Sequence, residues 1–175
     1  SIDFDIRELI NNTKKSIELK AEENDNLFIL NINNNVPTIL TSDPVRLNQI
    51  LINLVGNALK FTKNGSVKLI YSLIEKDKKT ASIKIEVIDS GVGIEQSKLN
   101  KIFDSFSQED ESTTRNFGGT GLGLSISKQL VSLLGGDLKV TSIPNEGSNF
   151  FFELQLPIGT PIIKKVSSAY MIETN

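Results

Sequence analysis

The sequence has 175 residues, of which 38% are hydrophobic and 23% are charged, a balance typical of one globular domain with a full hydrophobic core. Nineteen basic residues stand against 21 acidic ones, so the net charge of −2 gives no reason to expect nucleic acid or an acidic membrane surface as a partner. The chain contains neither cysteine nor histidine, which excludes disulfides, thiolate metal sites, histidine metal ligands and histidine general bases within it.

The periodicity of apolar residues predicts a mixed succession of helices and strands. In chain order, the predicted elements are a strand at 4–6, a helix at 7–23, strands at 27–32 and 39–40, a helix at 44–62, strands at 67–74 and 83–88, a helix at 122–134, and strands at 138–142 and 149–156. The second helix has the clearest start, because Asp43 can cap it and Pro44 suits its first position.

The predicted helices and strands do not alternate strictly, as they would in a parallel βαβ fold. We therefore expect an α+β fold, a two-layer α/β sandwich in which one mixed sheet is covered by three helices. Residues 89–121 form a long polar loop, with a short helical piece near 96–102, and such loops are usually functional or disordered. We place the domain at 1–157 and a linker or tail at 158–175, where few core residues remain.

The helix predicted at 44–62 carries a polar stripe. At about 100° per residue, Asn53, Asn57 and Lys60 share one flank and Phe61 lies at its edge. An asparagine oxygen is a suitable ligand for Mg²⁺, and a lysine one turn away can meet phosphate charge. The alternative is a solvated helix face, because the same flank also carries an arginine and a glutamine.

The strand predicted at 83–88 leads into Asp89-Ser-Gly91-Val-Gly93. An aspartate at a strand end can accept a hydrogen bond from an exocyclic amine such as that of adenine. The two glycines would let a flat ring approach the backbone without a Cβ clash. The alternative is a tight turn that merely leaves the strand.

A third motif, Gly118-Gly-Thr-Gly-Leu-Gly123, opens the helix predicted at 122–134. Amides at a helix N-terminus bind phosphate, with the helix dipole behind them. The run is not a Walker A loop, because no Gly-Lys-Ser/Thr follows it. It is not a dinucleotide-binding fingerprint either, because no predicted strand leads directly into it and the pattern Gly-x-Gly-x-x-Gly is absent. A hinge for a mobile loop is the structural alternative.

Together these motifs resemble the ATP-binding catalytic domain of two-component sensor histidine kinases, over about residues 2–156. The segments that resemble its N, G1, F and G2 boxes follow in that family's order: Asn53-Leu-Val-Gly-Asn57-Ala-Leu-Lys60-Phe61-Thr62, Asp89-Ser-Gly91-Val-Gly93-Ile94, Ile102-Phe103-Asp104-Ser105-Phe106-Ser107-Gln108, and Gly119-Thr120-Gly121-Leu122-Gly123-Leu124-Ser125-Ile126. Gly147-Ser148-Asn149-Phe150 before the last strand also fits.

The resemblance implies the fold shared by histidine kinases, DNA gyrase, the ninety-kilodalton heat-shock chaperone and mismatch-repair ATPases, with ATP under a long lid. It implies that Asn57 coordinates Mg²⁺, that Asp89 binds the adenine amine and that Phe103 anchors the lid, for which simple core packing is the alternative. The nucleotide-binding residues that it implies are Asn53, Asn57, Lys60, Phe61, Asp89, Gly91, Gly93, Ile94, Phe106, Arg115, Gly119, Thr120, Gly121, Leu122, Gly123 and Ser148. Among them Ser148 would act at the adenine end through water, and Arg115 would reach the γ-phosphate unless it is a solvated lid residue.

Hydrolytic members of this superfamily carry a glutamate one turn before the metal asparagine, where this chain has Asn53. A neutral amide cannot accept a proton as a general base, so the site is expected to hold ATP for transfer to a histidine rather than to hydrolyse it. A degenerate nucleotide-binding module of a pseudokinase and a hydrolytic ATPase stay as alternatives.

The resemblance implies three kinds of partner. The phospho-accepting histidine would lie on a dimerisation domain upstream of Ser1, the parent would be a homodimer, and a response regulator or receiver domain would take the phosphate onward. The start at Ser1 rather than Met indicates an excised domain. No apolar run approaches the ~18 residues of a membrane span, so we expect a cytoplasmic domain without direct membrane contact, whether or not its parent is membrane-anchored.

Overall fold

The computed structural model describes residues 1–104 and 122–161 of the chain. The helices and strands in chain order are β1 (Ile2–Asp5), α1 (Ile6–Glu23), β2 (Leu27–Ile32), β3 (Ile39–Ser42), α2 (Pro44–Lys60), β4 (Ser66–Lys76), β5 (Thr80–Asp89), α3 (Gln96–Leu99), α5 (Gly123–Leu133), β6 (Lys139–Ile143) and β7 (Gly147–Pro157). Their kinds and order agree with the predicted elements, and their bounds differ by a few residues at most ends.

Five of the strands form one mixed sheet in the order β2-β4-β5-β7-β6. β2 pairs with β4 in parallel, and every other pair in this sheet is antiparallel. β1 and β3 lie apart as an antiparallel pair. The sequence analysis expected one sheet, and the pairing of β1 with β3 makes a second, small one.

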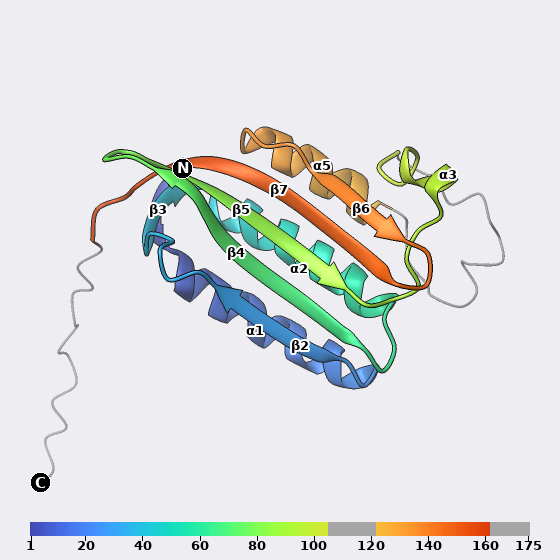
Figure 1. Cartoon of the computed structure of the whole chain (residues 1–175). Coiled ribbons are helices and arrows are strands. Elements are labelled where there is room, and N and C mark those ends of the chain that lie inside the picture. The colour runs from blue at the N-terminus through green and yellow to red at the C-terminus, as the bar shows by residue number, and fades with distance from the viewer. Residues whose placement is uncertain (105–121, 162–175) are drawn as a thin grey trace, which may run out of the picture.

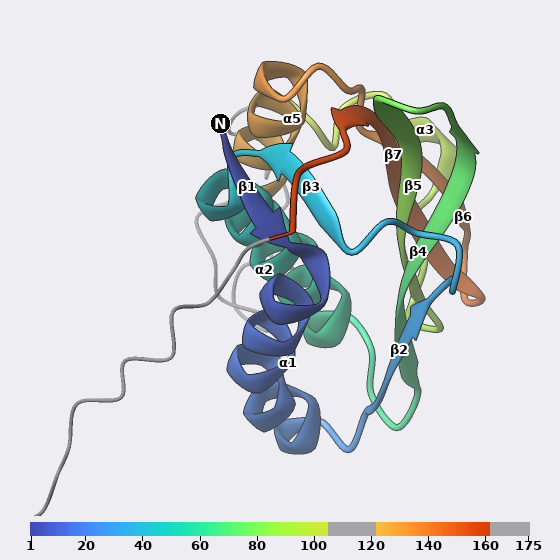
Figure 2. The same cartoon turned by 90° about the vertical axis from the view of Figure 1, so that its left-hand side faces the viewer.

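The main sheet and the helices form two layers. Figures 1 and 2 show α1, α2 and α5 together on one face of the sheet, as predicted. Alternate residues of β5, from Ala81 to Asp89, are buried under this layer. The intervening side chains face the other side of the sheet and are only half-buried. The expected two-layer α/β sandwich is therefore confirmed.

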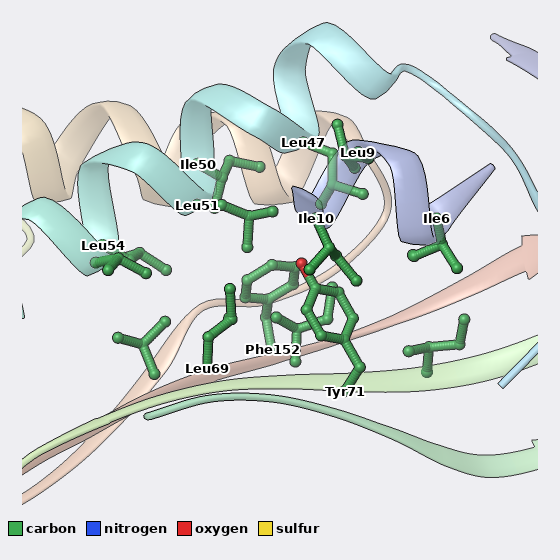
Figure 3. Close-up of a cluster of buried hydrophobic side chains, with 14 of the residues drawn as sticks. Ile6, Leu9, Ile10, Leu47, Ile50, Leu51, Leu54, Leu69, Tyr71 and Phe152 are labelled. Atoms are coloured by element: carbon green, nitrogen blue, oxygen red, sulfur yellow. The ribbon is translucent and has the colours of Figure 1, made fainter. Parts of the chain in front are cut away.

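The core lies between the two layers, where the buried apolar faces of helices and sheet meet. Figure 3 shows Leu69, Tyr71 and Phe152 of the sheet pointing toward Ile10 of α1 and Leu51 of α2. All five side chains are at most 1% exposed. Burial of each such side chain contributes about 1.5–3 kcal/mol. This layer fixes α2, the helix with the polar stripe, against the sheet.

Local signals set the bounds of the first two helices. The Asp5 carboxylate accepts the backbone N–H groups of Arg7 and Glu8, so α1 starts at Ile6 and β1 ends before it. Asp43 caps α2 by accepting the N–H of Arg46, and Pro44 occupies the first turn, as predicted. These caps orient both helices as the chain leaves the small sheet.

The described C-terminal residues stay packed beyond the predicted boundary at 157. Ile158 pairs with Leu40 in an isolated bridge, and Gly159 donates to the Ile39 carbonyl. The Asp3 carboxylate accepts the hydroxyls of Thr41 and Thr160, so that β1, β3 and this segment share one acceptor. These hydrogen bonds lower the pKa of the Asp3 carboxyl.

Most of the predicted lid, from 105 to 121, lies outside the described residues, as does the tail from 162. Within the described part, α3 and the turns that follow it begin the lid region, and α3 is shorter than the helical piece predicted at 96–102. None of the described helices has the length and apolar composition that a membrane crossing requires.

Candidate functional site

The described parts of the motifs singled out in the sequence lie at one end of the sandwich. The C-terminal ends of α2 and β5, the N-terminal end of α5 and the β6–β7 turn all lie at the same end (Figure 1). Since α5 packs against α2, and β5 and β7 are paired, these segments hold fixed positions relative to one another.

The polar stripe of α2 is half-buried rather than fully solvated. Asn53, Asn57, Lys60 and Phe61 are each partly covered, whereas Arg46, nearer the helix start, is exposed. The opposite side of the helix carries the buried residues, as the helical periodicity predicted: Leu47, Ile50, Leu51, Leu54, Val55, Ala58 and Leu59. The alternative of a plain solvated face therefore holds only for the N-terminal part of α2, where Arg46 and Gln49 are exposed.

Lys60 brings a partly desolvated charge to the stripe. Its Nζ lies 5.2 Å from the ring centroid of Phe61, within the range of a cation–π contact. Burial lowers the pKa of the Lys60 ammonium. None of the ion pairs within the described residues involves Lys60, so no protein carboxylate there offsets its desolvation. An anionic ligand would do so.

The end of α2 is joined to the loop after β5 through the backbone. The N–H of Val92 donates to the Phe61 carbonyl at 3.3 Å. A Cβ atom on Gly91 would lie 2.4 Å from the same carbonyl oxygen and 2.8 Å from Thr62 Oγ1, so only glycine fits there. The sequence suggested that Gly91 allows the close approach of a ligand ring; in the structure it allows the close approach of α2.

Asp89 ends β5 with its carboxylate on the helix-covered face of the sheet, and the residue is 8% exposed. Its Oδ1 accepts the N–H of Gly91 at 2.8 Å. Burial raises the pKa of the Asp89 carboxyl, against the lowering effect of the backbone N–H groups of Gly91 and Ser148. No ion pair within the described residues neutralises it. It is therefore a buried acceptor that a ligand N–H group can use.

Asp89, Ser148 and Ser142 form a row across β5, β7 and β6. Ser148 is the cross-strand partner of both other residues, and all three are at most 8% exposed. Ser142 Oγ lies 2.9 Å from Ser148 Oγ and accepts the backbone N–H of Ile94 at 2.8 Å. Ser142 thus connects Ser148 and Ile94, two of the residues expected to bind the nucleotide.

The turn within the predicted G1 box is held by the β6–β7 hairpin. Gly93 has φ = +68°, and a Cβ atom there would lie 2.1 Å from the Ile143 carbonyl oxygen. The N–H of Asn145 donates to the Val92 carbonyl at 2.7 Å. Gly93 thus serves the turn itself, which is the structural alternative considered for this motif, while Asp89 stays available to a ligand.

The N-terminus of α5 offers amides to an anion. Leu122 stands at the N-cap position and makes no side-chain capping bond, and its carbonyl accepts the N–H of Ile126. Gly123 begins the helix, and a Cβ atom there would meet nothing within 4 Å. The described N-cap residue therefore offers the first-turn amides no side-chain acceptor that would compete with a phosphate oxygen.

The sequence matches over residues 42–158 the family described as "Histidine kinase-, DNA gyrase B-, and HSP90-like ATPase". This span covers most of the described domain, including α2, β5 and β7. The chain belongs to this family. The similarity to this family therefore extends beyond the four boxes, over residues 42–158.

Among the relatives of this ATPase domain are several large sensor kinases. The sensor protein GacS of Pseudomonas syringae pv. syringae is 39% identical over 90% of this chain, which matches 17% of GacS. The histidine-protein kinase BarA of Escherichia coli K12 is 37% identical over 93% of the chain, which matches 18% of BarA. The chain thus spans less than a fifth of either relative's length.

Two solved structures share the fold of this ATPase domain. Full-length ShkA in complex with AMPPNP superimposes with a TM-score of 0.77 at 30% identity, over 91% of this chain and 32% of that one. The nucleotide-free catalytic domain of the histidine kinase ThkA gives a TM-score of 0.67 at 28% identity, over 87% of this chain and 93% of that one. The predicted histidine-kinase-type ATP-binding catalytic domain is confirmed.

The remaining predicted site residues divide into two groups. Phe103 is half-buried and packs edge-on against Phe150, with ring centroids 6.3 Å apart, so it contacts the core, and its role as an anchor stays a prediction. The following predicted residues lie outside the described part of the ATPase domain: Phe106, Arg115, Gly119, Thr120 and Gly121.

Sequence reasoning missed two residues that hold the site of this ATPase domain together. Asn26 donates from Nδ2 to the carbonyls of Leu59 and Thr62 and accepts the N–H of Gly65, which fixes the end of α2. Ser142 fixes Ile94, as described above. Neither stands in a motif: Asn26 lies in a polar turn after α1, and Ser142 is one polar residue in an alternating strand. Only the long-range contacts distinguish them.

A cavity of about 490 Å³ lies on the β6–β7 side of Asp89 in this ATPase domain. Its described lining residues are Ile88, Asp89, Gln96, Leu99, Val140, Thr141, Ser142, Ile143, Glu146, Gly147, Ser148 and Asn149. No α2 residue is among them, so this cavity includes Asp89 and Ser148 but not the polar stripe. The described residues also contain no cluster of three or more acidic side chains that could hold a metal ion by themselves.

Proposed function

We propose that the domain binds Mg-ATP and donates its γ-phosphoryl group to a histidine on a separate or upstream dimerisation domain in two-component signalling. The observation that carries the proposal is Asp89, a buried acceptor without a cation partner in the described part of the chain. It is joined through Gly91 and Val92 to the helix that bears Asn53, Asn57 and Lys60. Backbone hydrogen bonds thereby connect the proposed base acceptor with the helix proposed to bind phosphate. The chain that contains them belongs to a family of ATPases.

Each residue of the site has a role in this proposal. Asp89 accepts the exocyclic amine of adenine, and Lys60, whose desolvation no carboxylate among the described residues offsets, meets phosphate charge. Asn57 would supply an oxygen ligand to Mg²⁺, and the ion would neutralise phosphate charge there. Asn53 stands one turn earlier on the same side of α2 and contacts the phosphates. Phe61 flanks the nucleotide.

In this proposal the Mg²⁺ ion arrives with the nucleotide. When bound, Mg-ATP supplies the γ-phosphoryl group, which passes to an imidazole nitrogen of the partner domain while the bond to the bridging oxygen breaks and ADP remains. The residues of this chain position the nucleotide and neutralise charge, which are the main contributions that a protein makes to phosphoryl transfer.

Asn53 favours transfer over hydrolysis. It occupies the helical position one turn before Asn57, where hydrolytic members of the superfamily are expected to carry a glutamate. Its neutral amide cannot take a proton from water. The partners that follow from the proposal are a histidine-bearing domain of the same parent, a response regulator or receiver domain, and a second copy of the parent.

The test supplies a histidine-bearing dimerisation domain to this chain with γ-labelled ATP and Mg²⁺, and it measures acid-labile phosphohistidine and free phosphate separately. We expect slow transfer to the added domain, negligible phosphate release, and no labelling of this chain, which has no histidine. Asn57→Ala should abolish transfer. Rapid phosphate release by the chain alone would favour a hydrolytic ATPase, and tight binding without transfer to any of several partner domains would favour a pseudokinase.

A further inference from the structure

The row formed by Asp89, Ser148 and Ser142 contains two hydroxyl groups whose protons can be assigned. Ser142 Oγ has three hydrogen-bonding neighbours: the Gly147 carbonyl at 2.9 Å, the Ile94 N–H at 2.8 Å and Ser148 Oγ at 2.9 Å. A hydroxyl has one proton to donate and two lone pairs to accept with. These three contacts use its full capacity.

The chemistry of the neighbours decides which group donates. A carbonyl oxygen only accepts, so the Ser142 proton goes to Gly147. A backbone N–H only donates, so Ile94 occupies one lone pair of Ser142 Oγ. The third contact is then a hydrogen bond only if Ser148 is its donor. Ser148 has no proton left for a ligand.

Ser148 therefore presents lone pairs alone, and its neighbour on β5 is the carboxylate of Asp89. Cross-strand partners have Cβ atoms about 4.5–5.5 Å apart, so the two acceptors face one region of space. An exocyclic amine has two N–H groups and can serve both acceptors. A carbonyl oxygen in the same position would meet two acceptors and no donor, and desolvated polar groups left unpaired weaken binding.

We propose that Ser142 is a positioning residue for base selectivity: by accepting the Ser148 proton it makes Ser148 an acceptor, so that the site takes a 6-amino purine and rejects a 6-oxo purine. This inference rests on the proposed nucleotide-binding function and adds to it Ser142, which acts through Ser148. Ser142 also holds the Ile94 amide, which affects both kinds of base alike and can be separated from selectivity.

The experiment compares the affinities of Mg-ADP and Mg-IDP by calorimetry, because the inosine base carries a carbonyl where adenine carries its amine. The full 175-residue chain is used as wild type, Ser142→Ala, Ser148→Ala and the double variant. We expect the wild type to prefer ADP, and Ser142→Ala to reduce the ADP-to-IDP affinity ratio about tenfold, because the freed Ser148 proton can turn toward the carbonyl.

The double variant tests whether Ser142 acts through Ser148. Ser148→Ala should also lower the ratio, and Ser142→Ala should change the ratio no further in that background, since coupled residues are not additive. Ser142→Thr keeps the hydroxyl and should keep the ratio. Melting temperatures monitor folding; if Ser142→Ala does not fold, a wild-type ratio in Ser148→Ala would itself overturn the proposal.

The remaining outcomes are separable. If ADP and IDP weaken equally in Ser142→Ala, its role is structural and the selectivity proposal fails. If the two single variants lower the ratio independently, Ser142 does not act through Ser148 and the proposal also fails. If the wild type binds neither nucleotide while folded, the nucleotide-binding function fails instead, and the selectivity proposal fails with it.

Discussion

The backbone N–H of Val92 donates to the carbonyl of Phe61, which joins the loop after β5 to the last turn of α2. Phe61 in turn donates its own N–H to the Asn57 carbonyl at 3.2 Å. Two backbone hydrogen bonds, through Phe61, therefore connect the residue proposed to bind magnesium with the loop beside the proposed base acceptor. The distance between the base end and the phosphate end of the site is set by backbone rather than by flexible side chains.

Asp89→Asn should weaken Mg-ADP binding by about tenfold to a hundredfold. A hydrogen bond to a charged group contributes about 1.5–3 kcal/mol, and the amide offers one acceptor oxygen in place of two. Calorimetry on the variant and on Asp137→Asn, an exposed carboxylate in the loop after α5, measures the effect. Equal affinity in wild type and Asp89→Asn would remove Asp89 from the site.

The same variant should be more stable than the wild type at neutral pH. Burial raises the pKa of Asp89 above its ordinary value of 3.8, so folding favours the protonated carboxyl. The contribution of the protonated Asp89 carboxyl to the free energy of unfolding is complete below its pKa in the unfolded state. It is lost as the pH rises through its pKa in the folded state. The advantage of Asp89→Asn should therefore be largest near pH 7 and should shrink as the pH falls toward 3.8, in urea unfolding.

Asp77 supplies a control of opposite sign. The N–H groups of Lys79 and Thr80 donate to its carboxylate and lower its pKa, so its contribution is present above the unfolded pKa and is lost on acidification. Asp77→Asn should be less stable than the wild type at neutral pH, with a deficit that closes as pH falls. Parallel pH profiles for the two variants would contradict at least one of the two assignments.

The sequence predicted the local part of this architecture well. The cap at Asp43 and the alternation along β5 depend on neighbouring residues, so pattern and capping rules suffice for them. The row of Asp89, Ser148 and Ser142 depends instead on the register between three strands, which no local pattern states. The pairing of β1 with β3 in a separate sheet likewise depends on contacts between residues far apart in the sequence, which local patterns do not predict.

Asn26→Ala should cost about 2–4 kcal/mol in the free energy of unfolding. The change leaves the Thr62 carbonyl and the Gly65 N–H without this partner and the Leu59 carbonyl with only its longer bond from Asn24, and unsatisfied buried groups cost about 1–3 kcal/mol each before relaxation. The matched control is Asn24→Ala, because Asn24 makes one longer bond of 3.3 Å to Leu59 in a less buried place. Similar losses in both variants would show that Asn26 has no special role.

Gly91→Ala and Gly56→Ala should have opposite effects on stability. A Cβ atom on Gly91 would overlap the Phe61 carbonyl oxygen, so the loop must move away from α2, at about 1–3 kcal/mol, and nucleotide affinity should fall with it. On Gly56, inside α2, a Cβ atom meets nothing within 4 Å of the described structure, and alanine should stabilise the helix by up to about 1 kcal/mol. A stable Gly91→Ala variant with unchanged affinity would show that the two segments need not be in contact.

Lys60→Met should lower affinity for phosphate while leaving the unliganded domain equally stable or more stable. Burial lowers the pKa of the Lys60 ammonium, so the charged side chain is desolvated without a carboxylate partner among the described residues, and an apolar side chain of similar length removes that cost. A bound phosphate offsets the desolvation, so Mg-ADP affinity should fall about tenfold and AMP affinity should fall less. Thermal unfolding and calorimetry measure the two effects, with Lys68→Met, exposed on the other face of the sheet, as the control.

If the affinities for ADP and AMP fall equally in Lys60→Met, Lys60 does not contact the phosphates beyond the first. If the variant instead loses stability, the cation–π contact of Lys60 with Phe61 outweighs the desolvation of the Lys60 charge. The interpretation that Lys60 is destabilising until a phosphate binds would then be wrong.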